Sequence, residues 1–144
     1  MQIKPLSDIE YAEWLPLWQA YQTFYKTTLS DSVNTLTWQR LSDTTKHNMY
    51  GFAALVDNQL VGIVHMVEHE SCWTERPYAY LQDLYVIPAA RGKGIARGLI
   101  EYIGEYCHSH CDRVYWLTHE TNETARALYD QVATQTGFIQ YRLK

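Results

Sequence analysis

The sequence lacks the features that would place it in a membrane, in a secretory pathway or on nucleic acid. No apolar run among its 144 residues approaches the roughly 18 residues of a membrane-spanning helix. The first residues, Met-Gln-Ile-Lys-Pro, lack the apolar core of a signal peptide. The formal net charge of −4 gives no basic footprint for nucleic acid. We therefore expect a cytoplasmic protein with neither a membrane nor a nucleic-acid partner.

Repeats, low-complexity tracts and linkers are also absent, so nothing in the sequence divides the chain. With 47% apolar and 19% charged residues the composition is that of an ordinary globular protein, and 144 residues suffice to bury a full core. We predict one domain over residues 1–144. Its mildly acidic balance is compatible with a cationic amine substrate.

Cysteine is scarce, with only Cys72, Cys107 and Cys111 present. An odd number in a reducing compartment argues against a disulfide framework. The run Cys-His-Ser-His-Cys ending at Cys111 places two thiols one helical turn apart, but structural zinc more often uses Cys-x-x-Cys with a second ligand pair elsewhere. The run also ends a predicted helix, where histidines interact well with exposed carbonyls. We predict no metal site, with zinc at this run as the alternative.

Two common phosphate-binding loops are missing as well. A Walker A loop needs Gly-Lys-Ser/Thr, and a dinucleotide fingerprint needs a third glycine where Arg97 stands. A different loop of small and basic residues follows the apolar strand and opens an amphipathic helix, where free N–H groups bind phosphate or pyrophosphate. The alternative is a tight turn without a ligand. The loop consists of Arg91, Gly92, Lys93, Gly94, Ile95 and Ala96.

A second segment supports the ligand-binding interpretation. A predicted strand is followed by Asn122 at a helix start, then by Tyr129 and a Gly-Phe turn. Seven residues at about 100° each return within roughly 20° of the starting face, so Asn122 and Tyr129 point the same way. Taken singly, Asn122 is a helix cap and Tyr129 a core aromatic. Because both residues lie on one helix face and follow the glycine loop in the sequence, they indicate a shared site.

Hydrophobic periodicity predicts elements in the order β-α-α-β-β-β-α-β-α-β. This order implies an α/β (α+β) fold with helices on both faces of one central mixed sheet. The predicted helices span residues 8–25, with Pro16 as an irregularity that breaks or kinks the helix, about 32–42, 92–110 and about 123–133. The predicted strands span residues 2–4, 51–56, 60–67, 78–87, 114–118 and 138–143, with Asp57-Asn58 as a hairpin turn.

The strand at residues 78–87 is apolar on both faces, as a central strand is. Strict alternation puts Gln82 and Leu84 on one face and Leu81, Asp83 and Tyr85 on the other. A carboxylate in such a strand needs a partner, because burying a charge costs free energy. Asp83 is a candidate general base, a group that orders water, or the hydrogen-bond partner of a neighbouring loop.

The pattern Arg91-x-x-Gly94-x-Ala96 after a strand, with the Asn122–Tyr129 pair behind it, resembles the GNAT superfamily of acetyl-CoA-dependent N-acetyltransferases. The resemblance covers nearly the whole chain, with specific motifs in residues 80–100 and 114–138. The strand Tyr-Leu-Gln-Asp-Leu-Tyr-Val looks most like that of the small polyamine- and histone-type members. The resemblance implies the GNAT fold and acetyl-CoA as co-substrate.

The resemblance also implies roles for individual residues. Backbone groups of Leu84, Tyr85 and Val86 would contact the pantetheine arm, and amides in the glycine loop would cradle the pyrophosphate. This strand and the one at residues 114–117 would splay apart to admit the cofactor. Asn122 would contact the cofactor arm, and Tyr129 would protonate the departing thiolate. The reaction would be direct attack of a primary amine on the thioester in a ternary complex.

The acceptor amine must lose a proton, because an amine with a pKa near 10 is mostly protonated at neutral pH. In polyamine acetyltransferases the strand reads Leu-Glu-Asp and this glutamate is thought to handle the proton, whereas this chain has Gln82. Several routes stay open. Asp83 or Glu68 acts through water, the amine arrives neutral, or the substrate is not a polyamine.

The remaining expectations concern partners. The expected partner is a small-molecule or peptide amine. Aromatic residues of the first two helices can cage a cationic amine, and the alternative is that most of these aromatics belong to the core. Residues 138–143 alternate as an edge strand does, so we expect them to pair across a homodimer. The alternative function is a non-catalytic acyl-CoA-binding sensor or interaction module, which only the non-titratable Gln82 favours.

Overall fold

The computed structural model describes residues 1–144 and has one five-stranded sheet. Its strands are β1 (Gln2–Pro5), β2 (Met49–Val56), β3 (Gln59–His69), β4 (Tyr78–Val86) and β5 (Arg113–Tyr115). They lie in the order β1-β2-β3-β4-β5, antiparallel except for β5, which is parallel to β4. The helices are α1 (Tyr11–Phe24), α2 (Asp31–Ser42), α3 (Ile95–Cys107) and α4 (Glu123–Val132). The predicted mixed α/β class is confirmed.

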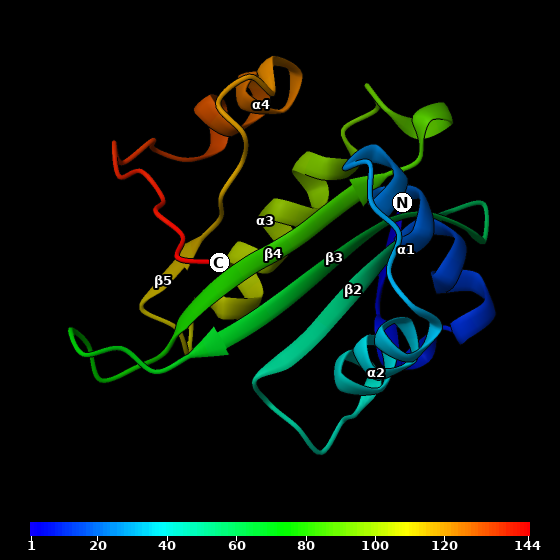
Figure 1. Ribbon diagram of the computed structural model, residues 1–144, viewed down its shortest axis with the longest axis horizontal. Coiled ribbons are helices and arrows are strands. Elements are labelled where there is room, and N and C mark those ends of the chain that lie inside the picture. The colour runs from blue at the N-terminus through cyan, green and yellow to red at the C-terminus, as the bar shows by residue number, and fades with distance from the viewer.

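Helices cover both faces of this sheet (Figure 1). On one face α3 packs on the larger core cluster through Leu99, Ile103 and their neighbours. On the other face α1 and α2 bury a second cluster around Trp14, Trp18 and Leu41. None of the helices combines the length and the apolar composition that a bilayer crossing requires.

Local sequence signals set several of the element ends. Asp57 and Asn58 have φ angles of 50° and 61°, so both occupy the left-handed region that a tight two-residue hairpin turn requires. The Ser30 side chain accepts a hydrogen bond from the Val33 amide and caps α2. The hairpin turn at Asp57-Asn58 was predicted from the sequence and is confirmed.

Helix α1 runs without interruption through Pro16, so the predicted break does not occur. Proline removes one backbone N–H donor and crowds the preceding turn. Trp14, Leu17 and Trp18 on either side of it are buried, and this packing holds the helix together. The helix also begins later than predicted, because Leu6–Asp8 forms a separate 3₁₀ turn.

The last predicted strand is not formed, and the observed element order ends with α4. Residues 134–144 have no regular secondary structure, and Phe138, Ile139 and Tyr141 are at least 75% exposed. Alternation by itself does not make a strand, since its N–H and C=O groups need a partner ladder. The neighbouring β5, predicted over residues 114–118, has three residues and offers a short edge.

Strand β4 contains a bulge at Gln82 that strict alternation did not predict. His65 pairs with Asp83 and Met66 with Leu81, so Gln82 is the extra residue. As a result Ala79 and Leu81 face α3, whereas Asp83 and Tyr85 face α1. The predicted placement of Leu81 and Asp83 on one face is therefore wrong.

Candidate active site

The parallel pair β4–β5 opens into a cleft along its length. Pairing covers only Tyr78 with Arg113, Ala79 with Val114 and Tyr80 with Tyr115. Beyond these three pairs the strands diverge and line a cavity of about 790 Å³. This is the splay that the sequence led us to expect. The strand residues on its walls are Leu81, Gln82, Leu84, Tyr85 and Val86 of β4, and Trp116, Leu117 and Thr118 after β5.

The glycine loop closes one end of this cavity. Gly92 and Gly94 have φ angles of 74° and 81°, a region that other residues enter only with strain. Gly94 is the N-cap of α3, and the first helical bond runs from the Gly98 amide to its carbonyl. The amides of Ile95, Ala96 and Arg97 therefore have no partner within the helix. Together with the helix dipole they form a site for an anion.

Basic side chains surround the loop, but they do not act alike. The Arg91 Nε donates to the Val86 carbonyl at 3.0 Å, and its guanidinium lies 5.6 Å from the Tyr85 ring centroid. Arg91 thereby fixes the loop against the end of β4. Lys93 is exposed and is not among the residues that line the cavity.

Arg97 is a cavity residue that was not predicted from the sequence, where it marks only the absence of a third glycine. It lines the cavity and donates to the Gln131 side chain of α4. This contact joins α3 to α4 beside the loop and adds a positive charge to the anion site. The signal available in the sequence was a basic residue in the first helical turn after the loop.

The opposite wall comes from α4 and brings Asn122 and Tyr129 to the same cavity, as predicted. The Asn122 side chain donates to Thr118 Oγ1 at 3.2 Å and makes no capping bond to α4. The helix-cap interpretation of Asn122 is therefore wrong for its side chain.

The Tyr129 ring lies 5.4 Å from Trp116, and its hydroxyl makes no hydrogen bond within the protein. Burial raises the pKa of Tyr129 above its ordinary value, so the hydroxyl keeps its proton at neutral pH. It is suited to donate that proton to a leaving group that develops negative charge in the cavity.

Asp83 lies behind the cavity wall and belongs to a buried polar chain. Trp14 Nε1 donates to His65 Nε2 at 3.0 Å, and His65 Nδ1 lies 3.0 Å from Asp83 Oδ2. Because Nε2 accepts, His65 carries its proton on Nδ1 and donates it to the carboxylate. Of the roles considered for Asp83, the structure shows that of a hydrogen-bond partner. Its partner is His65 of strand β3, not a neighbouring loop as predicted.

Two tyrosines lie on the side of the cavity that faces Asp83. Tyr21 and Tyr25 line the cavity on the side of α1. Burial chiefly, and then the nearby Asp83 carboxylate, raises the pKa of Tyr21 well above its usual range. Tyr21 thus stands between the cavity and the Asp83 carboxylate.

Glu68, the other carboxylate considered as a base, lies elsewhere. It faces α3 and makes contacts with Tyr50 and His110. It lines a different cavity and not the cleft between β4 and β5. Glu68 is therefore not positioned to act in the cleft.

The sequence matches the Acetyltransferase (GNAT) family over residues 9–133. This chain belongs to that family. Its GNAT segment includes the splayed strands, the glycine loop and α4. The D-amino-acid N-acetyltransferase HPA3 of Saccharomyces cerevisiae is 33% identical over 97% of this chain and 88% of its own length. The thialysine N-epsilon-acetyltransferase of Caenorhabditis elegans is 31% identical over 58% of this chain and 52% of its own. The protein is thus an enzyme of the GNAT type.

Solved structures share this GNAT fold. A probable acetyltransferase superposes with a TM-score of 0.86 at 22% identity, covering 100% of this chain and 97% of the other. The aminoglycoside acetyltransferase AAC(6′)-Iy, solved with a bisubstrate analogue of CoA, superposes with a TM-score of 0.83 at 15% identity. That match covers 99% of this chain and 97% of the other.

Proposed function

We propose that this protein transfers an acetyl group from acetyl-CoA to a primary amine within a ternary complex. One observation carries the proposal: a single cavity is lined by the glycine loop, the splayed strands, Asn122 and Tyr129. These groups supply an anion site, a cleft and a proton donor around one cavity. The residues present fit acetyl-CoA, because the loop amides suit its pyrophosphate and the cleft suits its pantetheine arm.

The cofactor side of the site follows from the backbone. Amides of the loop from Arg91 to Ala96, with the Arg97 side chain, hold the pyrophosphate. Leu84, Tyr85 and Val86 offer backbone groups to the pantetheine arm where β5 no longer pairs with β4, apart from the Val86 carbonyl, which already accepts from Arg91. Asn122 contacts the same arm from α4. Lys93 contributes its amide and adds positive charge at the loop.

Acetyl-CoA supplies an activated thioester, and the protein supplies orientation and proton handling. A backbone N–H of the splayed strand polarises the acetyl carbonyl. Tyr129 donates its proton to the sulfur as the thiolate departs. Because burial keeps Tyr129 protonated, the donor is available at neutral pH.

We propose that the amine proton leaves toward Asp83 through Tyr21. Tyr21 lines the cavity and lies close to the carboxylate, whereas Gln82 has no titratable group. A tyrosine can accept a proton on its oxygen while giving its own to a neighbouring carboxylate. His65 balances the arrangement by donating to Asp83 from the core side.

The acceptor is a small amine. Tyr21, Phe24 and Tyr25 provide an aromatic wall on the side of α1, and such a wall attracts cationic amines. The similarity to a D-amino-acid N-acetyltransferase over 97% of the chain supports amino acids as the first class to test. Polyamines, aminoglycosides and lysine peptides follow.

The test is acceptor-dependent release of CoA from acetyl-CoA across these four classes. Mass spectrometry of the acetylated product avoids thiol dyes, which would also react with the exposed Cys72. Product with one class confirms the transferase and identifies the acceptor. Acetyl-CoA binding without transfer to any amine would favour the sensor alternative, and no binding would contradict the proposed role of the loop.

We further propose that residues 1–144 act as one domain and assemble as a homodimer. The tail presents Phe138, Ile139, Tyr141 and Leu143 to solvent, and β5 leaves one edge unpaired. Pairing of one tail with the β5 edge of a second copy would bury both. Light scattering should give twice the chain mass, and Ile139→Glu combined with Tyr141→Glu should give a monomer. We also propose a cytoplasmic location, since all three cysteines are free.

A further inference from the structure

Four potential metal ligands meet at the far end of α3, away from the cleft. They are Glu68 from β3, Cys107 from the last turn of α3, and His110 and Cys111 from the turn that follows. Their ligand atoms all lie within 4.8 Å of one another. Cys107 and Cys111 are buried, and Glu68 and His110 are partly buried.

The Cys-His-Ser-His-Cys run alone predicted no metal site, because structural zinc more often uses Cys-x-x-Cys with a second ligand pair elsewhere in the chain. The fold supplies the missing group, since Glu68 reaches the run across 42 residues and lies 2.9 Å from His110 Nε2. The cluster therefore holds two thiols, an imidazole and a carboxylate.

The spacing of these atoms approaches that of a tetrahedral site. With bonds of about 2.0–2.3 Å to zinc, tetrahedral ligand atoms are about 3.3–3.8 Å apart. The observed separations of up to 4.8 Å exceed this by about 1 Å, which small side-chain rotations supply. Tyr50 already donates to Glu68 and lies 3.4 Å from Cys107 Sγ, so it orients both groups from outside the ligand set.

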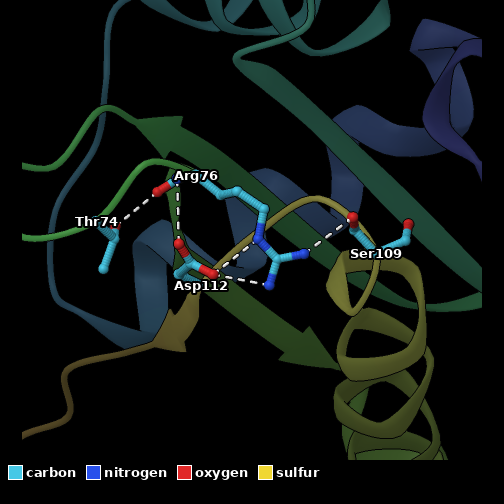
Figure 2. Close-up of polar contacts among 4 residues, drawn as sticks. All are labelled: Thr74, Arg76, Ser109 and Asp112. Atoms are coloured by element: carbon cyan, nitrogen blue, oxygen red, sulfur yellow. Dashed lines mark hydrogen bonds and ion pairs between the residues drawn. The ribbon is translucent and has the colours of Figure 1, made fainter.

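The turn that carries His110 and Cys111 is held in place by a polar network (Figure 2). Arg76 Nε and Nη2 each lie 2.7 Å from Asp112 Oδ1, and Arg76 Nη1 donates to the Ser109 carbonyl at 3.1 Å. The Arg76 amide donates to Asp112 Oδ2, and the Asp112 amide donates to the Pro77 carbonyl. The turn is thus fixed against the connection that precedes β4, and little ordering remains when an ion binds.

An ion can reach the cluster from solvent. A cavity of about 590 Å³ is lined by Glu68 and His110, together with Tyr50, Tyr106 and the segment after α2. The two thiols lie deeper, against the sheet. The cavity supplies an entry path that a buried pair of cysteines alone would lack.

We propose that Glu68, Cys107, His110 and Cys111 form a zinc-binding site. Two thiolates with one imidazole and one carboxylate suit Zn²⁺ and disfavour the hard cations Mg²⁺ and Ca²⁺. Four protein ligands close a tetrahedron and leave no position for substrate, so the ion joins β3 to the end of α3 and does not catalyse. The cluster lies about 20 Å along α3 from the glycine loop, given 13 residues at 1.5 Å each.

The test uses the reduced full-length chain after treatment with a chelator. Titration with Co²⁺ should give one ion per chain, with a thiolate charge-transfer band and the visible bands of a tetrahedral site. Zn²⁺ should displace Co²⁺ and raise the midpoint of thermal unfolding, because an ion that binds only the folded chain stabilises it.

Two variants and a matched control locate the site. His110→Gln and Cys111→Ser should weaken metal binding by at least about tenfold, the least that loss of even a supporting partner gives. Cys72→Ser removes the exposed third thiol and should bind metal as the wild type does. Acetyl-CoA binding and circular dichroism establish that each variant is folded.

Three results would overturn the proposal. The wild type takes up no stoichiometric ion, the cobalt spectrum lacks the thiolate band, or folded His110→Gln and Cys111→Ser both bind metal as tightly as the wild type.

Discussion

The two ends of α3 use the same neighbours, β4 and β5, in opposite ways. At the open end, around the loop from Arg91 to Ala96, the strands have separated and backbone groups are left for a ligand. At the tied end, around Cys107 and Asp112, the strands are paired and Arg76 binds the turn before β5. The open end has polar groups without protein partners, and the tied end has nearly all of its polar groups satisfied.

The difference shows how β4 and β5 can separate to form a cleft while β5 remains part of the sheet. Two strands that separate at one end must be fixed at the other, or the cleft has no defined width. Three ladder pairs and the Arg76–Asp112 contacts provide that fixation. Changes at the open end should therefore affect chemistry and binding, and changes at the tied end should affect stability.

The largest effect is expected from removing the proton donor at the open end. Tyr129→Phe keeps the ring against Trp116 and deletes the hydroxyl. We expect kcat to fall about 100-fold, within the usual range for a general acid, while the Kd for acetyl-CoA is unchanged. Rapid-quench kinetics and calorimetry measure the two quantities. An unchanged kcat would remove Tyr129 from the mechanism.

The proton path behind the cleft should have a smaller effect. Asp83→Asn keeps the shape of the side chain and an acceptor for His65 but removes the negative charge. We expect kcat/KM to fall about tenfold at neutral pH and to recover as the pH rises and more of the amine is neutral. Tyr21→Phe should show the same pH profile, since it interrupts the same path. A normal pH profile in both variants would show that neither Asp83 nor Tyr21 handles the proton.

The loop backbone can be tested with a matched pair of glycines. Gly94→Ala places a side chain at a φ of 81°, which costs on the order of 1 kcal/mol unless the loop moves. We expect acetyl-CoA to bind up to about tenfold more weakly. Gly104→Ala in the middle of α3 has open space around its Cβ and should leave binding unchanged while stabilising the helix. Equal affinities for both variants would contradict the role of the loop conformation.

The tied end should respond in stability alone. Arg76→Ala removes the contacts to Asp112 and Ser109, and we expect the unfolding midpoint to fall by a few degrees. The Kd for acetyl-CoA should stay at the wild-type value. Arg40→Ala on the exposed surface of α2 is the control and should change neither quantity. A weakened Kd in Arg76→Ala would show that the two ends are coupled.

The smallest effect is a missing feature in the pH profile. A pKa raised by burial means that Tyr129 loses its proton only above the ordinary tyrosine value of 10.0. A group with a raised pKa keeps its acid form below that value and loses it as the pH rises through it. We therefore expect that titration of Tyr129 causes no fall in the wild-type kcat below about pH 10. Below that pH the profiles of the wild type and of Tyr129→Phe should have the same shape. Such a fall at lower pH would mean that the Tyr129 hydroxyl is more acidic than its burial implies.

Much of the open end could be read from the sequence because its signals are local. Glycines at a helix start, and Asn122 and Tyr129 seven residues apart, depend on helix geometry alone. The same holds for the Asp57-Asn58 turn. Local rules failed where a partner decides the outcome, as in residues 138–143, which have the alternation of a strand but no ladder in this chain.

The tied end could not be predicted from the sequence, because it too depends on contacts between residues far apart in the chain. Glu68 meets Cys107 and Cys111 only because β3 and α3 pack together, and no spacing in the sequence joins positions that far apart. Pro16 is the opposite case, because a local signal predicted a break that tertiary packing prevents. Burial of the neighbouring tryptophans outweighs the local cost of the proline. Arg97 could have been predicted, because a basic residue in the first helical turn after the loop favours an anion site.

The bulge at Gln82 has a consequence for the evolution and redesign of this enzyme. The extra residue belongs to neither core cluster, yet it lines the cleft and is exposed. A substitution there can alter the floor beneath the acceptor without repacking α1 or α3. Deleting the residue would remove the bulge and restore strict alternation, with Leu81 and Leu84 still toward α3 and Tyr85 still toward α1. Position 82 is therefore free to vary in identity because neither core cluster includes its side chain, so new acceptor preferences can arise there by single substitutions.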